Sequence, residues 1–289
     1  MQSLTVAEIV TRALAEDIGP GDITTNLVVP FGTQADAAVV ARERLVVSGA
    51  TIAKEVFSQV DDSLICEIVK SDGQAVEKGD LVLKLKGNAA SILTAERTAL
   101  NFLMRLSGIA SLTRRFVEAI GTNGPKLLDT RKTTPGLRVL EKAAVRHGGG
   151  ENHRFALYDG ILIKDNHIVS AGGIQKALAM AKALAPAGLK IEIEVETIAE
   201  ELEALKGGAD ILLLDNMDPP TLQRAVKEAN NFFAPNRRRV LLEASGGVSL
   251  NTISQIALSG VDYISAGAIT HSAPSADLAL DFYSRGTGS

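Results

Sequence analysis

The side chains with the clearest chemical potential are basic groups gathered between residues 127 and 167, interleaved with glycines and short apolar runs. From residue 126 to residue 167 the chain has eight Lys and Arg against five Asp and Glu, before three histidines are counted. If these cations converge in the fold, they need an anionic partner, and a small ligand with several carboxylates or phosphates would provide it. The cations are Arg131, Lys132, Arg138, Lys142, Arg146, His153, Arg154, Lys164 and His167.

An acidic stretch lies further along, where residues 192 to 215 hold eight Asp and Glu against one Lys. Its first part, Ile191 to Glu196, alternates apolar residues with glutamates, so the glutamates share one face of a strand. On an edge strand that face would meet water. In a barrel it would point into the lumen, where a carboxylate is costly unless it meets a metal, a cation or a ligand hydroxyl. Glu194 is therefore a candidate for binding a sugar hydroxyl or a metal-bound water.

Asp215 directly follows the apolar run Ile211 to Leu214. A strand-terminal aspartate is often a turn former or a helix cap, and Asn216 and Pro219 support that alternative. If Asp215 instead lies beside Glu194 on a neighbouring unit, the two carboxylates can hold Mg²⁺ through water.

Two glycine motifs come after the last two predicted strands: Ser245-Gly246-Gly247 and Ala266-Gly267-Ala268. Each motif could simply form a turn between a strand and the helix that follows. In parallel barrels, however, the last two strand-to-helix loops frequently bind a phosphate through backbone N–H groups. The pair therefore favours a phosphate cradle.

Lys164 follows the apolar run Ile161 to Ile163, and an inward lysine there could be a Schiff-base nucleophile or a fixed cation for an anion. The many neighbouring cations favour the second role.

Arg97, in a helical stretch that starts near Ser91, is best interpreted from the residues alone as a solvated surface arginine. The glycines at 148–150 lack the flanking strand and helix of a dinucleotide-binding loop. They more readily allow a tight turn of the backbone that places His153 and Arg154 at the site.

Composition excludes several classes of protein. The net charge of −4, from 30 basic and 34 acidic residues, gives no global basic field for nucleic acid. Cys66 is the only cysteine, which fits a reducing, cytoplasmic location. No apolar stretch reaches the ~18 residues that a membrane-spanning helix needs, and no signal peptide is evident.

The pattern of elements predicts two parts. Residues 6–14 have helical spacing, residues 35–87 are rich in short strands, and residues 91–120 are helical, with breaks expected at Gly108 and Gly121. From residue 127 onward short apolar runs alternate with helical stretches, which is typical of parallel βα units. Polar or glycine residues end five of these runs and favour a parallel α/β barrel, with a doubly wound open sheet as the alternative.

Many of these motifs, in this order, resemble the quinolinate phosphoribosyltransferase family. The resemblance covers nearly the whole chain and is carried by the following segments: Gly21-Asp22-Ile23-Thr24-Thr25, Thr94-Ala95-Glu96-Arg97-Thr98, Asp129-Thr130-Arg131-Lys132-Thr133, Asn152-His153-Arg154, Leu162-Ile163-Lys164-Asp165-Asn166-His167, Leu213-Leu214-Asp215-Asn216 and Glu243-Ala244-Ser245-Gly246-Gly247. One departure is Ala156, where the family often has glycine, and it should be tolerated if its φ is negative.

The resemblance implies an α/β fold: an N-terminal α+β sandwich domain over residues 1–110, an incomplete parallel α/β barrel over residues 111–269, and a tail, 270–289, that packs back on the first domain. It implies a homo-oligomer, dimer or hexamer, with shared active sites. It also implies phosphoribosyl transfer from 5-phosphoribosyl-1-diphosphate to quinolinate, with decarboxylation, using Mg²⁺, in NAD biosynthesis.

The resemblance also implies residue roles. Quinolinate would be held by Arg131, His153, Arg154 and Lys164, with Arg97 reaching a neighbouring subunit's site, which reverses the surface interpretation. The phosphoribosyl donor would meet Lys132, Glu194, Asp215, Ser245, Gly246, Gly247 and Gly267. The catalytic residues would be Lys164, Glu194 and Asp215, and the last two would also bind the metal, through water. Two other functions remain open: a Schiff-base lyase using Lys164, and a noncatalytic protein that senses a phosphorylated ligand.

Overall fold

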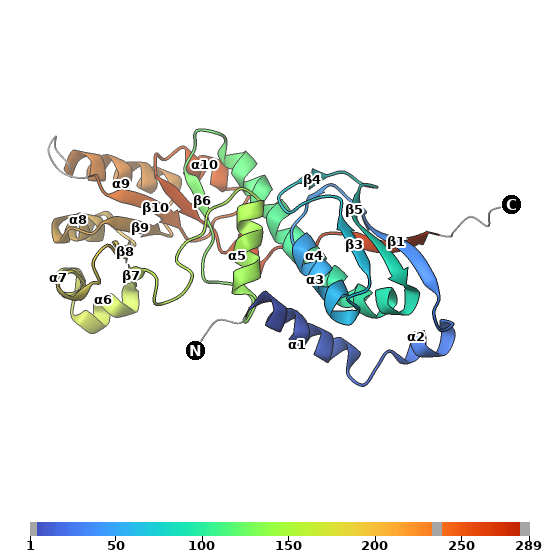
Figure 1. Ribbon diagram of the computed structural model, residues 1–289. Coiled ribbons are helices and arrows are strands. Elements are labelled where there is room, and N and C mark those ends of the chain that lie inside the picture. The colour runs from blue at the N-terminus through green and yellow to red at the C-terminus, as the bar shows by residue number, and fades with distance from the viewer. Residues whose placement is uncertain (1–4, 233–238, 284–289) are drawn as a thin grey trace. The chain divides into compact units, whose positions relative to one another are not determined.

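The computed structural model describes residues 5–232 and 239–283 (Figure 1). The chain divides into two compact units. The first contains residues 1–114, 133–149 and 272–289, and the second contains residues 115–132 and 150–271. The segment 133–149, expected in the barrel domain, thus falls in the first unit.

The first unit combines helices with short strands. Its elements are α1 (Val6–Ile18), α2 (Ile23–Val28), β1 (Gln34–Ala41), β2 (Leu45–Val46), α3 (Ala50–Val60), β3 (Ile65–Ile68), β4 (Ala75–Val76), β5 (Leu81–Asn88), most of α4 (Ala89–Ile120), α5 (Arg138–His147) and β12 (Leu278–Tyr283).

The first unit is built on a four-stranded antiparallel sheet in the order β12-β1-β5-β3. Helix α3 packs against β3 and α1, burying Val56 and Phe57 completely. Strand β12 pairs with β1 from Asp36 opposite Tyr283 to Ala41 opposite Leu278, so the end of the chain returns to the sheet that its beginning forms. The remainder of the expected tail, residues 284–289, lies outside the described residues.

The expected helix break at Gly108 is wrong, because α4 runs without interruption from Ala89 to Ile120. Gly108 serves close packing instead: a Cβ added there would lie 1.9 Å from the carbonyl oxygen of Pro274. The domain boundary expected after residue 110 therefore falls inside a continuous helix. The second expected break is confirmed, since α4 ends just before Gly121, which has a φ of +85° that favours glycine.

The second unit alternates strands and helices. Its elements are β6 (Lys126–Leu128), β7 (Ile161–Ile163), α6 (Asp165–Ala171), α7 (Ile174–Leu184), β8 (Ile191–Val195), α8 (Ile198–Gly207), β9 (Ile211–Asp215), α9 (Pro219–Phe232), β10 (Leu241–Ser245), α10 (Ile253–Ala257), β11 (Tyr263–Ser265) and α11 (Ala268–His271).

These six strands form one parallel sheet in the order β6-β11-β10-β9-β8-β7. From β7 to β11 each strand pairs with the next along the chain, and the first strand, β6, joins the last. A doubly wound sheet would reverse its strand order at a switch point, so this alternative is excluded. Because no pairing joins β6 to β7 among the described residues, the barrel is incomplete, as expected.

The expected helices cover the strands of the second unit. The consecutive helices α7, α8 and α9 pack side by side, and their apolar faces bury Leu178, Leu205 and Leu222. The strands contribute Ile193, Leu212, Leu214, Leu242 and Ile264, each at most 2% exposed. Helix α8 begins with a capping box, in which Thr197 and Glu200 exchange side-chain to backbone hydrogen bonds. Among the described residues, no helix is long and apolar enough to cross a membrane.

Candidate active site

A cavity of about 520 Å³ lies in the second unit. Alternate residues of the strands line it, because successive side chains of a strand point to opposite faces and every second one points to the barrel interior. The lining residues are Thr130, Arg131, Lys132, His153, Arg154, Leu162, Lys164, Glu194, Leu213, Asp215, Asn216, Glu243, Ser245, Gly246, Gly247 and Ser265. The structure thus brings together ten of the twelve site residues expected from the sequence.

The basic part of the cavity contains two neighbouring arginines. Burial, and then the positive charge of Arg131, lower the pKa of the Arg154 guanidinium from its usual value. The guanidinium Nη1 of Arg154 donates to the carbonyl oxygen of Gly160 at 3.0 Å, which fixes its direction. Two adjacent cations facing one cavity repel each other, and a ligand with two carboxylates would relieve that repulsion.

The loop that follows Arg154 is held by Asp159, which accepts hydrogen bonds from the backbone N–H groups of Phe155 at 2.6 Å and Ala156 at 2.7 Å. Among the described residues, Asn216 is the only non-glycine residue with a positive φ. Ala156 therefore has the negative φ that makes alanine acceptable where the family often has glycine.

Lys164 and Glu194 form an ion pair across neighbouring strands. Nζ of Lys164, directly after β7, lies 2.5 Å from Oε2 of Glu194 on β8. Strand β8 lies between β7 and β9, so it is not an edge strand and its glutamates do not simply face water. This contact with a carboxylate favours the role of a fixed cation for Lys164 over that of a Schiff-base nucleophile.

Asp215 ends β9 and lines the cavity, and its register partner on β10 is Ser245. Its Oδ2 accepts a hydrogen bond from Nδ2 of Asn216 at 2.7 Å. Asn216 has a φ of 54°, and its backbone N–H donates to the carbonyl oxygen of Ser245 at 3.0 Å. This local network supports both the turn and the placement of the carboxylate, so the two alternatives for Asp215 are compatible.

The glycines at the strand ends permit close approaches. Gly246 has a φ of +86°, and a Cβ there would lie 2.2 Å from Oδ1 of Asn216. A Cβ on Gly267 would lie 3.0 Å from Cδ of Lys132 and 3.1 Å from Cδ2 of His271. Lys132 is also tied to this loop, because its carbonyl oxygen accepts a hydrogen bond from Thr270 Oγ1 at 2.8 Å. The absence of a side chain at Gly267 thus allows the Lys132 side chain to pass close to the backbone of this loop.

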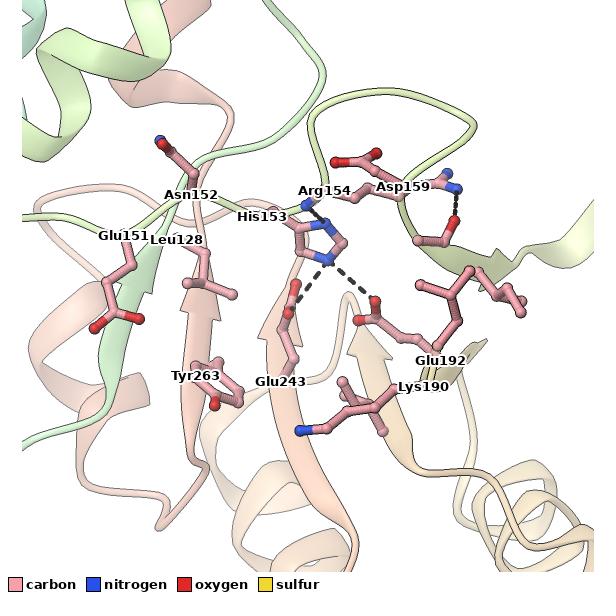
Figure 2. Close-up of a pocket in the computed structure, with 14 residues that line it drawn as sticks. Leu128, Glu151, Asn152, His153, Arg154, Asp159, Lys190, Glu192, Glu243 and Tyr263 are labelled. Carbon is pink, nitrogen blue, oxygen red and sulfur yellow. Dashed lines mark hydrogen bonds and ion pairs between the residues drawn. The ribbon is translucent and has the colours of Figure 1, made fainter. Parts of the chain in front are cut away.

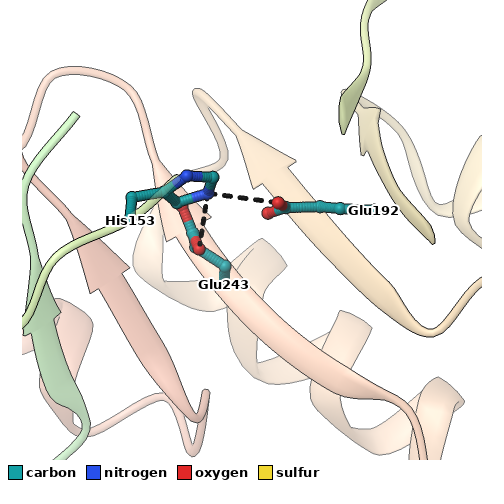
Figure 3. A group of neighbouring side chains, drawn as sticks. All are labelled: His153, Glu192 and Glu243. Carbon is teal, nitrogen blue, oxygen red and sulfur yellow. Dashed lines mark ion pairs between the residues drawn. The ribbon is translucent and has the colours of Figure 1, made fainter. Parts of the chain in front are cut away.

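His153 lies against two buried carboxyl groups that had no role in the sequence-based hypothesis (Figure 3). Its Nε2 is 3.1 Å from Oε2 of Glu192 on β8 and 3.6 Å from Oε2 of Glu243 on β10. Burial, and then the charge of Glu192, raise the pKa of Glu243 to about 7. The alternation of β8 indicated that Glu192 shares a face with Glu194, but no sequence signal linked either strand to His153.

Arg97 lies on α4 in the first unit, with an exposed side chain. Its expected role in binding quinolinate remains a proposal.

Comparisons with known proteins match this chain over nearly its whole length. Family models for the N-terminal and C-terminal domains of quinolinate phosphoribosyl transferase match residues 22–107 and 109–281. A probable nicotinate-nucleotide pyrophosphorylase (carboxylating) of Bacillus subtilis is 43% identical over 97% of this chain and 94% of its own length. A quinolinate phosphoribosyltransferase (decarboxylating) of Nicotiana glauca is 41% identical over 94% of this chain and 81% of its own.

A solved structure, the nicotinate-nucleotide pyrophosphorylase of Francisella tularensis, superimposes with a TM-score of 0.88 and 42% identity, covering 96% of each chain. The two family models, the relatives and the solved structure therefore agree, and the chain belongs to the quinolinate phosphoribosyltransferase family.

Proposed function

We propose that this enzyme transfers the phosphoribosyl group of 5-phosphoribosyl-1-diphosphate to quinolinate and decarboxylates the product. The products are nicotinate mononucleotide, diphosphate and CO₂, as in the synthesis of NAD. One observation carries the proposal: a single cavity is lined both by basic groups, which are two neighbouring arginines and Lys164, and by Glu194 and Asp215 with a glycine-rich loop. The ion pair of Lys164 with Glu194 joins the two sets. A pyridine diacid and an activated pentose phosphate need these two sets of groups side by side.

Quinolinate would be bound by Arg131, Arg154 and Lys164. Arginine suits this role because its planar fork can bind a carboxylate through two hydrogen bonds. His153 also lines the cavity, although both of its ring nitrogens already face protein groups. We therefore assign it mainly to placing Arg154.

The phosphoribosyl donor would lie beside quinolinate in the same cavity. Glu194 and Asp215 would accept hydrogen bonds from ribose hydroxyls, and Ser245, Gly246, Gly247 and Gly267 would bind the 5-phosphate. Positive φ at both Gly246 and Gly247 turns the backbone sharply after β10, as close contact with a phosphate requires. Lys132, close to Gly267, would attract the diphosphate.

The donor set fits Mg²⁺. Glu194 and Asp215 project from neighbouring strands into the same cavity, and Mg²⁺ usually binds one or two carboxylates while keeping several waters and substrate phosphates. When bound, Mg²⁺ would offset the negative charge on the departing diphosphate.

In the proposed chemistry, the ring nitrogen of quinolinate forms a bond to C1 of the ribose as the bond from C1 to the diphosphate breaks. The nitrogen becomes positively charged, so the bond to the 2-carboxylate can break with its electrons left on the ring. CO₂ departs and a proton from water replaces it. Side chains that hold both reactants in line can supply several kcal/mol of the barrier reduction.

Assembly, location and domain roles follow the same proposal. The active form would be a cytoplasmic homo-oligomer, dimer or hexamer, in which Arg97 reaches the quinolinate site of a neighbouring subunit. Residues 1–110 with the 270–289 tail would act as the N-terminal sandwich domain, and residues 111–269 as the catalytic barrel. No nucleic acid or membrane would take part.

The direct test mixes the purified protein with quinolinate, 5-phosphoribosyl-1-diphosphate and Mg²⁺, and measures CO₂ and diphosphate together. Release of both in equal amounts is expected. Tight binding of both substrates without turnover would select the sensor alternative. Trapping of a keto acid on Lys164 by borohydride would select the lyase.

A further inference from the structure

A buried cluster of His153, Glu192 and Glu243 lies between two cavities of the second unit. The active-site cavity is lined by His153 and Glu243, and a second cavity of about 280 Å³ is lined by all three residues. Figure 2 shows this second cavity, with the His153 ring pointing toward both carboxyl groups. The Glu192 and Glu243 side chains are only 7% and 2% exposed, so both carboxyl groups are nearly shielded from bulk water.

The hydrogen bonds of His153 define which ring nitrogen carries the proton. Its Nδ1 accepts the backbone N–H of Arg154 at 2.8 Å, so this nitrogen presents its lone pair. The proton of the neutral ring is therefore on Nε2, which faces the carboxyl oxygens of Glu192 and Glu243. The carboxyl groups and the Arg154 backbone thus bind opposite sides of one imidazole.

Hydrogen bonds also hold the backbone at His153 and the residue before it. The buried carboxylate of Asp129 accepts the N–H of His153 at 2.9 Å and Nδ2 of Asn152 at 2.5 Å. The ring therefore cannot shift freely along the chain. Any change in its orientation would act on the N–H of Arg154.

One histidine and two carboxylates could also suggest a metal site. A metal at Nε2 would need that nitrogen unprotonated and the proton on Nδ1. The proton on Nδ1 would then oppose the N–H of Arg154, which points at the same atom. Hydrogen bonding, not metal binding, fits the geometry of this cluster.

We propose that Glu192 and Glu243 are positioning residues that act through His153 to place Arg154 for binding the pyridine diacid. They fix the imidazole from the barrel interior, the imidazole fixes the Arg154 backbone, and Gly160 fixes its guanidinium. The inference rests on the proposed function for the identity of the diacid. The raised pKa of Glu243 is consistent with it, because a partly protonated carboxyl group places less negative charge near a bound dianion.

The kinetic test compares Glu243→Ala, Glu243→Gln and a matched control, Glu201→Ala. Glu201 is also fully buried in the second unit but lies on α8, away from the cavity. Glu243→Ala should raise the KM for quinolinate by about tenfold or more, because small displacements of a binding group are costly. The KM for the phosphoribosyl donor should change by less than about twofold. Glu243→Gln keeps an acceptor oxygen and should recover most of the loss.

A double variant tests the route through His153. His153→Ala with Glu243→Ala should be no worse than His153→Ala alone, because the carboxyl group has no effect without the ring. Additive losses, or a Glu243→Ala enzyme with an unchanged quinolinate KM, would overturn the proposal. So would equal changes in both KM values that match those of the Glu201→Ala control.

A measurement on the unaltered protein separates this inference from the proposed function. The chain has four histidines, so ¹⁵N spectra of histidine-labelled protein can be assigned by single substitutions. His153 should show a neutral ring protonated on Nε2, with or without turnover. A ring protonated on Nδ1 would refute the cluster geometry. Absence of CO₂ release with the expected tautomer would refute only the reaction.

Discussion

Nζ of Lys164 lies 2.5 Å from Oε2 of Glu194, so a residue proposed to bind one substrate is paired with a residue proposed to bind the other. Lys164 directly follows β7 and Glu194 lies on β8, and these two strands are direct neighbours in the sheet. In the proposed complex, the lysine would be shared between Glu194 and a carboxylate of quinolinate. The pair thereby couples the position of the diacid to the position of the ribose.

Lys164→Ala should reduce turnover by roughly 10²–10³-fold, the range typical of losing one well-placed polar group of an active site. The loss of stability should be modest, because the Lys164 side chain is 45% exposed, and the Glu194 carboxylate that it leaves behind, 11% exposed, lines a cavity. Steady-state release of diphosphate and a thermal melt measure the two effects. Lys206→Ala, an exposed lysine on α8, is the matched control. Near-normal diphosphate release by Lys164→Ala would remove this lysine from the mechanism.

Arg131→Ala should also lower turnover strongly while the protein stays folded. The structure supports this expectation through the effect of Arg131 on its neighbour, since its charge contributes to the lowered pKa of Arg154. Removal of one arginine leaves the diacid with fewer bidentate partners. The KM for quinolinate, measured at saturating phosphoribosyl donor, should rise more than the KM for the donor. The reverse order would place Arg131 on the phosphoribosyl part of the cavity.

Gly246→Ala should impair binding of the phosphoribosyl donor. The φ of +86° is strained for alanine, and the added Cβ would meet Asn216 at 2.2 Å. Its KM for the donor should rise by about tenfold, as for other small displacements of binding groups. Gly188→Ala is the control: its φ is +89°, but no atom lies within 4 Å of the new Cβ. Gly188→Ala should lose about 1–2 kcal/mol of stability from its backbone strain alone. Gly246→Ala should lose more, because it adds the contact with Asn216, and only Gly246→Ala should change the kinetics.

The pattern of strands and helices in the second unit could be predicted from the sequence because burial imposes a periodicity on each strand. The period-two alternation of Ile191 to Glu196 correctly placed Glu192 and Glu194 on one face of β8, whereas Glu196 lies beyond the end of the strand. It could not distinguish Glu192, which faces His153, from Glu194, which faces Lys164. Those partners are 39 and 30 residues away, respectively, and only the parallel sheet brings them together.

The misplaced helix break shows a related limit of local patterns. Glycine often ends a helix, so Gly108 suggested a break. What requires glycine there is the carbonyl oxygen of Pro274, 166 positions further along the chain. Similarly, Glu243 directly follows the apolar run Val240 to Leu242, which is a local signal for a polar residue at the site. Its burial and its pairing with His153 depend on contacts that the run itself does not encode.

Glu201 predicts a pH dependence of stability that is independent of catalysis. It is fully buried on α8, neither carboxyl oxygen has a hydrogen-bond partner in the described part of the chain, and burial followed by the charge of Glu228 raises its pKa to about 8. In the unfolded chain its pKa should be near the ordinary 4.5. Between these values the unfolded state binds fewer protons than the folded state, so the free energy of unfolding falls as the pH rises.

Glu201→Gln replaces the carboxyl group by a neutral amide of the same size and should remove this dependence. Near pH 4.5 the variant and the unaltered protein should have similar free energies of unfolding. The variant should become the more stable of the two as the pH rises through 8, by on the order of 1–3 kcal/mol. Urea titrations at pH 5 and pH 8.5 measure the difference, with Glu203→Gln as an exposed control on the same helix. Parallel pH profiles for Glu201→Gln and the unaltered protein would show that this carboxyl group ionises in the folded state as it does in water.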